Sequence, residues 1–221
     1  MKFAEFPYKR PDLAAAMTQL EALSDSIRGA KTAQEAKEAF LSFEKITEEI
    51  GSLSSICYVR HTVDTRDPFY EGENTFWDEN LPLFTDKLLD IYRAMLASGH
   101  RPALEKDLGK LLFDKMEIEV KSADPSIIPL MQEENRLQTE YQQLYASAQI
   151  PFRGKTLTVA QLTPYKQDPD RTVRKAAFEA EGRFFDENQA KFDEIYDKLV
   201  KNRTEQARRM GYDSFVPLGY I

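Results

Sequence analysis

The chain has 221 residues, 42% of them hydrophobic and 30% charged, enough for one large or two small domains with a sizeable core. Its net charge of −7 excludes the basic surface that phosphate contacts require, so we expect no nucleic-acid partner. Charges between residues 2 and 10 prevent an apolar signal core, and no apolar run is long enough to span a bilayer, so no membrane partner is expected. The single cysteine, Cys57, rules out an intrachain disulfide and favours a reducing, cytoplasmic location.

The first part of the chain is predicted to form successive antiparallel helices. Apolar residues at helical spacing begin at Leu13, and Gly29 is the expected end of that helix. Thr32 with Glu35 forms a capping box that predicts the start of the next helix. Its apolar stripe comprises Ala36, Ala39, Phe40, Phe43, Ile46, Ile50 and Leu53, and extends to Cys57.

Three further helix starts follow. Asp67-Pro68 is typical of an N-cap followed by proline at the first helical position, and Pro82 should kink or split the helix that it opens. Pro102 is expected to start a helix whose one face carries Leu104, Leu108, Leu111 and Leu112. Asp124-Pro125 should start another, with Tyr141, Leu144, Tyr145 and Ala148 on its later apolar side.

The pattern changes at residue 150. Ile150 to Leu157 contains Gly154 between two short extended pieces, which predicts a small β-hairpin. Thr158 with Gln161 is a second capping box. The predicted fold class is therefore all-α, a multi-helix array of antiparallel helices with one small hairpin near Gly154. We place the domain boundary here, giving residues 1–149 and residues 150–221.

Two closing helices are expected. Asp168 is predicted to cap the first, with Pro169 as its first residue, and Gly182 and Asn188 bracket an expected break before the second. Gly211 should end the second helix. The apolar residues from Phe215 to Ile221 favour either a boundary inside a longer protein or a segment that docks on another surface.

One set of residues could bind a metal. Cys57, His61 and Asp64 fall at i, i+4 and i+7, so a continuous helix would align three zinc ligands and allow a metal-dependent enzyme. The simpler interpretation is that Cys57 continues the apolar stripe of its helix and is a small buried side chain. His61 lies in the chain between Arg60 and Arg66, whose charges disfavour a cation. We therefore assign no metal-binding residue.

Other candidates are also weak. His100 is expected to be solvated or to cap a helix, and with two histidines the sequence contains no H-E-x-x-H motif. Glu48-Glu49 and Glu133-Glu134 are predicted to lie on solvated helix faces. Arg203 lies near an apolar stripe, which allows two interpretations. Its guanidinium either pairs with a carboxylate, or it stays in water while only the aliphatic stem of the side chain is buried. No catalytic residue is assigned, and the substrate-binding residues stay unknown.

The second half of the chain is similar to a known family. The similarity is carried by Gly154-Lys155-Thr156-Leu157-Thr158 with Ala160-Gln161-Leu162, and by Asp168-Pro169-Asp170-Arg171 with Val173-Arg174-Lys175-Ala176-Ala177. It extends through Leu199-Val200, Arg203, Ala207, Gly211-Tyr212, Phe215 and Leu218-Gly219-Tyr220. These residues resemble the N-terminal half of oligoendopeptidase F, one of the thimet-type, or M3, zinc metallopeptidases.

The resemblance implies a cytoplasmic, almost wholly helical enzyme that hydrolyses short peptides inside a deep channel. Its zinc would be bound by an H-E-x-x-H helix and a downstream glutamate, neither of which this sequence contains. The resemblance therefore implies that this chain forms one wall of the channel, binds no zinc itself, leads into an absent C-terminal catalytic domain and is inactive alone. It also implies apolar surface that could drive self-association. The alternative is a freestanding helical scaffold or adaptor that binds protein partners through an apolar face.

Overall fold

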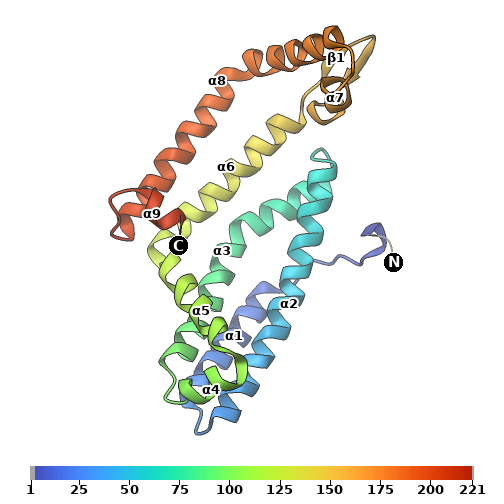
Figure 1. The fold of residues 1–221 in the computed structure, drawn as a ribbon. Coiled ribbons are helices and arrows are strands. Elements are labelled where there is room, and N and C mark those ends of the chain that lie inside the picture. Colours follow the sequence, from blue (N-terminus) through green and yellow to red (C-terminus); the bar gives the residue numbers. More distant parts are fainter. Residues whose placement is uncertain (1–2, 221) are drawn as a thin grey trace. The chain divides into compact units, whose positions relative to one another are not determined.

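The computed structural model describes residues 3–220, so the expectations that concern residue 2 and the end at Ile221 lie outside the described residues. It is helical, with one two-stranded antiparallel sheet, and this confirms the predicted fold class (Figure 1). The chain forms two compact units, one made by residues up to Gln132 together with those from Thr204 onward, and one by Glu133–Arg203. The predicted division into residues 1–149 and 150–221 stays a prediction.

Three long helices form the body of the first unit and contact one another pairwise (Figure 1). They are α1 (Leu13–Gly29), α2 (Ala33–Val63) and α3 (Pro68–Ala97), preceded by the short 3-10 helix η1 (Phe3–Glu5). Their apolar stripes meet in one core, in which Leu20, Phe43 and Ile91 are fully buried. The predicted stripes of α1 and α2 are thus confirmed as the faces that pack together.

The predicted capping residues of α2 and α3 lie at the starts of these helices. Asp67 accepts a hydrogen bond from the N–H of Phe69 at 2.9 Å and caps α3 as predicted. Thr32 accepts from the N–H of Glu35 at 3.2 Å, but the Glu35 carboxylate accepts from the N–H of Lys31 instead of returning to Thr32. The predicted capping box is therefore only half formed.

Two expectations about helix continuity are settled in the rest of the first unit. Pro82 lies inside α3 without splitting it, and α3 changes direction part-way along its length in Figure 1. The prediction of a single helix after Pro102 is wrong, because the chain forms two helices there, α4 (Arg101–Leu108) and α5 (Lys110–Ser122), which are separated at Gly109. Gly109 has a φ of 96°, which residues with side chains rarely adopt. The break leaves Leu111, expected on the buried face, 68% exposed.

The next helix begins as predicted. Asp124 accepts from the N–H of Ser126 at 2.8 Å and caps a 3-10 turn, η2 (Pro125–Ile127), which continues into α6 (Ile128–Ala146). Within the second unit, Leu137 is the buried residue of α6. The ring of Tyr141 on α6 contacts Phe192 with their centroids 5.5 Å apart. This contact joins α6 to the long helix α8 (Arg171–Arg209).

The hairpin is confirmed at the predicted place. Strand β1 (Ile150–Phe152) pairs with β2 (Lys155–Leu157) in antiparallel register, with Phe152 opposite Lys155. The turn between them contains Gly154 at a φ of 74°. The capping box of Thr158 and Gln161 is complete and starts α7 (Val159–Lys166). A separate small core joins these elements to α8 through buried Ile150, Leu162 and Ala177.

The two closing helices are a single helix, and the expected break is wrong. Gly182 lies inside α8, and the Asn188 side chain donates to the carbonyl of Phe184 at 2.9 Å, so it supports the helix instead of ending it. The cap is also shifted, because Asp170, and not Asp168, accepts from the N–H of the first turn at Thr172. After α8, Gly211 has a φ of 82° and ends it as predicted, and the short helix α9 (Phe215–Gly219) follows.

Candidate functional site

The structure does not bring together Cys57, His61 and Asp64, the three residues considered as possible zinc ligands. Cys57 and His61 are both fully buried on α2. Asp64 is the exposed C-terminal cap of that helix, and its carboxylate accepts from the backbone N–H and the Nε of Arg66 at 3.1 and 3.2 Å. Between residues 3 and 220, no group of three or more His, Cys, Asp or Glu side chains could hold a metal ion. Because a zinc site needs at least three protein ligands, these residues do not fit zinc.

A polar cluster that the sequence did not predict lies beside Cys57. We call it the Glu73 cluster, and it comprises Tyr8, Arg10, Cys57, Glu73 and Trp77. The Tyr8 hydroxyl donates to Glu73 Oε2 at 2.7 Å, and Arg10 donates from Nη2 to Oε1 at 2.7 Å and from Nε to both oxygens at 3.1 Å. Trp77 Nε1 donates to the Tyr8 hydroxyl at 3.1 Å. Two side chains of the N-terminal segment thus converge on one carboxylate of α3.

Burial and charge shift the pKa values in this cluster in opposite directions. The Arg10 guanidinium, helped by the Tyr8 hydroxyl, holds the pKa of Glu73 below its usual range although the carboxylate is buried. Burial raises the pKa of Cys57 to about 11, so its thiol is protonated and unreactive near neutral pH. Burial also raises the pKa of Tyr8, and the hydrogen bond to Glu73 acts in the same direction. Near neutral pH the Glu73 carboxylate is therefore charged, whereas the Cys57 thiol and the Tyr8 hydroxyl are neutral.

Neither histidine belongs to an acid–base pair. Both ring nitrogens of His61 are buried without a hydrogen-bond partner among residues 3–220. His100 is half-buried, and its Nε2 lies 3.2 Å from the carbonyl oxygen of Ala30. His100 precedes α4 but makes no side-chain capping bond, so it is tied to the end of α1 and not to its own helix. A nucleophile–base arrangement requires a second reactive side chain beside the base, and neither histidine has one within hydrogen-bond distance among the described residues.

Arg203 pairs with a carboxylate, which decides between the two interpretations left open by the sequence. Its Nε and Nη2 both lie 2.8 Å from Oε1 of Glu134. The Glu134 side chain is only 15% exposed, so the expectation that Glu133-Glu134 lies on a solvated face is wrong for Glu134. It faces α8 because α6 and α8 run side by side in the second unit (Figure 1). Glu48 and Glu49 on α2 are exposed, as predicted.

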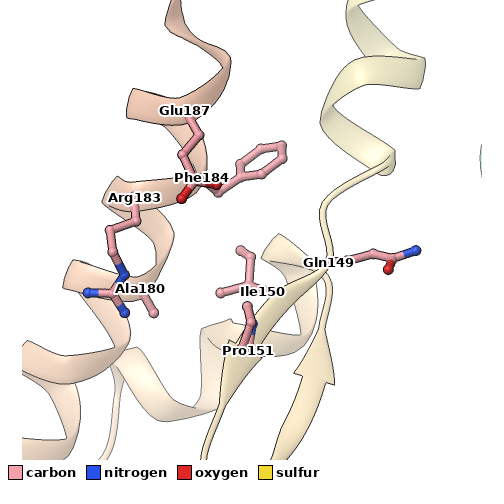
Figure 2. A pocket seen from close by; sticks show the side chains of 7 residues that line it. All are labelled: Gln149, Ile150, Pro151, Ala180, Arg183, Phe184 and Glu187. Carbon is pink, nitrogen blue, oxygen red and sulfur yellow. The ribbon is translucent and has the colours of Figure 1, made fainter.

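A small pocket of about 190 Å³ lies between the hairpin and α8 in the second unit. Figure 2 shows Ile150 and Pro151 of β1 facing Ala180 and Phe184 of α8, and the pocket is completed by Gln149, Arg183 and Glu187. Ile150 and Ala180 are buried, whereas Arg183 and Glu187 are exposed on successive turns of α8. The pocket is thus lined by apolar side chains and by two charged ones. It contains no histidine, cysteine or serine that could act as a catalytic base or nucleophile.

The comparisons with known proteins agree on one family. The Peptidase M3 N-terminal domain matches residues 3–123, which is more than half of the chain. No curated protein matches. Among the part of the chain that the structure describes, no helix is long and apolar enough to cross a membrane.

Solved structures match over nearly the whole chain. One is PZ peptidase A with an inhibitor, at 43% identity and a TM-score of 0.96 over 99% of this chain and 39% of its own. A second, described as an oligoendopeptidase F, has 41% identity and a TM-score of 0.96 over 100% of this chain and 39% of its own. A third is described as an oligoendopeptidase F from Bacillus anthracis str. Ames. It has 39% identity and a TM-score of 0.95 over 100% of this chain and 40% of its own. The chain thus spans about two fifths of their length, and it belongs to the peptidase M3 N-terminal domain family.

Proposed function

We propose that this chain is the N-terminal helical part of an oligoendopeptidase F-like zinc metallopeptidase that hydrolyses short peptides. The observation that carries the proposal is the match of 99–100% of this chain to about two fifths of solved peptidase chains, at TM-scores of 0.95 to 0.96. At 39–43% identity, the match extends beyond the general arrangement of helices. The partner that the proposal requires is a C-terminal catalytic domain, and the substrate class is short peptides.

Zinc would be bound by the catalytic domain and not by this chain. The sequence has two histidines and no H-E-x-x-H motif, and His61 and Cys57 are buried in the body of the first unit, apart from a third ligand. A water-activating zinc site needs three protein ligands and an open position. The residues present do not fit that requirement, so we expect the isolated chain to be inactive.

The role proposed for this chain is one wall of the substrate channel. A wall built from long, rigid helices excludes folded proteins from the reaction centre and screens it from bulk water. The long helices α3 and α8, of 30 and 39 residues, are the elements best suited to this role. We place the parent enzyme in the cytoplasm, which is supported by a single cysteine that cannot form an intrachain disulfide.

A peptidase assay tests the proposal. The purified chain is incubated with an internally quenched peptide, with and without added zinc, and no turnover is expected above the protein-free control. Turnover that a chelator removes would contradict the assignment of zinc to another domain. The coding sequence provides an independent test, because we expect the reading frame to continue into a segment that contains H-E-x-x-H.

The alternative function is a freestanding helical scaffold that binds protein partners. It is favoured by exposed apolar side chains on α8, where Tyr196 is 70% exposed and Val200 46% exposed. A reading frame that stops at residue 221 would support this alternative and exclude the peptidase part. A frame that continues into a zinc-binding helix would exclude the scaffold.

A further inference from the structure

We infer that residues 6–12 form a latch that Glu73 holds closed over α2 and α3, and that opens without unfolding of the helices to uncover Cys57. We call this segment the latch. The inference goes beyond the proposed function and does not depend on it, because it rests on contacts within the first unit alone.

The latch is held by side-chain contacts and not by regular secondary structure. It lies between η1 and α1 and contains neither helix nor strand. Tyr8 and Arg10 both donate to Glu73, and Trp77 donates to Tyr8. A third anchor comes from α2, where Arg60 Nη2 donates to the carbonyl of Phe6 at 2.6 Å. A segment that has no regular secondary structure and is held by the contacts of a few side chains belongs to the parts of a protein that open at low free energy.

One side of the latch does not pack against the helical body. A cavity of about 520 Å³ lies between the latch and the facing surfaces of α1 and α2. Residues 7–12 line one side, and Ala16, Ile50 and Leu53 are among the residues that line the other. Most of the latch is exposed, and Tyr8 and Pro11 are half-buried. The Tyr8 ring is the part of the latch that packs on apolar surface, with its centroid 6.2 and 5.8 Å from those of Phe69 and Tyr70. The hydrogen bonds to Glu73 hold Tyr8 and Arg10 in this position.

The contacts of Tyr8 and Arg10 with Glu73 depend on each other. The described hydrogen bonds of Glu73 come only from Tyr8 and Arg10, both on the latch. Loss of one weakens the position of the other, because both converge on the same carboxylate. When the latch is closed, Glu73 is 6% exposed and Cys57 is fully buried beside Tyr8. When it opens, water can solvate Glu73, and the wall of Cys57 formed by Tyr8 is removed.

The chain carries two unique reporters of this opening. Cys57 is its sole cysteine and Trp77 its sole tryptophan, and both contact Tyr8. The experiment follows modification of Cys57 in the folded chain by an aromatic disulfide reagent at increasing urea. Latch opening predicts a rate that is nearly independent of urea at low concentrations, whereas global unfolding gives a rate that rises steeply from the start.

Glu73→Gln should accelerate modification without urea roughly 10- to 100-fold, as expected when hydrogen bonds to a charged group are weakened. Arg10 remains solvated in this variant, since its side chain is 49% exposed. The matched control is Asp90→Asn. Asp90 accepts from Ser24 at 2.8 Å and from Arg28 at 2.7 Å, which joins α1 to α3 and does not involve the latch. In the Asp90→Asn variant, the rate of Cys57 modification without urea should stay within roughly twofold of the rate in the parent chain.

Tyr8→Phe provides a second test if Glu73→Gln does not fold. It keeps the ring and removes the hydroxyl that links Trp77 to Glu73. We expect a smaller acceleration, together with a change in Trp77 emission in the absence of urea. The inference is overturned if a folded Tyr8→Phe variant leaves both readouts unchanged. It is also overturned if Asp90→Asn accelerates modification as much as Glu73→Gln, because opening would then follow global stability.

Discussion

Glu73 links the stability of the chain to pH. Its pKa is lowered by the Arg10 guanidinium first and by Tyr8 second, whereas burial alone would raise it. A carboxyl whose folded pKa is depressed contributes stability above its unfolded pKa, about 4.3, and the contribution is lost as pH falls through the lower folded pKa. We expect Glu73→Gln to lower the free energy of unfolding by about 1–3 kcal/mol at pH 7.

Urea unfolding from pH 7 to pH 3 measures this contribution. The difference between the parent chain and Glu73→Gln should decrease as the pH falls below about 4.3, because protonation weakens the same hydrogen bonds in the parent chain. A difference that stays constant over the whole range would show that the charge of Glu73 does not contribute.

Arg203 is the second residue whose removal should be costly. Glu134 is mostly buried, and Arg203→Ala removes a guanidinium that donates from two nitrogens to one of its oxygens. We expect a loss of about 1–3 kcal/mol in the free energy of unfolding. Lys201→Ala is the control, since Lys201 and Asp197 are 74% and 57% exposed and such pairs contribute about 0–1 kcal/mol. Equal losses in the two variants would contradict a special contribution from Arg203.

These two residues show what sequence reasoning can find at a site. Arg203 is recognisable because a cation falls beside an apolar stripe, yet its partner Glu134 lies 69 residues away and cannot be identified from spacing. Glu73 has no such signal beyond its position four residues before Trp77, which places both on one helix face. Its partners come from a segment without periodicity, 63 and 65 residues earlier.

Two glycines should affect the stability of the chain in opposite directions when replaced by alanine, because one lies inside a helix and the other at a break between helices. Gly182 lies inside α8 and a Cβ added there meets nothing within 4 Å, so Gly182→Ala should raise the free energy of unfolding by about 0.5–1 kcal/mol. Gly109 also has open space, but its φ of 96° strains any residue with a side chain. Gly109→Ala should therefore lower stability by about 1–2 kcal/mol. Urea unfolding of both variants checks the signs, and stabilisation by Gly109→Ala would contradict the φ argument.

The same glycines explain which elements were predicted correctly. Capping residues and apolar periodicity are local, so the starts of α1, α3 and α7 and the hairpin follow from sequence. A glycine inside a helical pattern is ambiguous, because the conformation that it adopts depends on contacts elsewhere. The sequence predicts a break at Gly182, which lies inside α8, and a continuous helix through Gly109, where α4 ends.

The whole molecule has two compact units with separate cores, and the family match extends only to residue 123. The solved peptidase structures nevertheless match through the second unit, including α8. Periodicity predicts the helices of both units but not how they group. The grouping depends on contacts such as that of Tyr141 with Phe192, which join residues about 50 positions apart, and this separation does not appear in any local pattern.

Exposed apolar side chains on α8 predict weak self-association of the isolated chain. Tyr196 and Val200 lie one turn apart and are 70% and 46% exposed, so they form an apolar strip on the helix surface. Contiguous exposed apolar surface of this kind marks contact sites. We expect the average mass in solution to rise above that of the monomer at high concentration and to fall on dilution. The double substitution Tyr196→Glu with Val200→Glu should keep the chain monomeric at all concentrations, whereas Lys198→Glu, on another face of the helix, should not. A parent chain that is strictly monomeric throughout the dilution series would contradict the prediction.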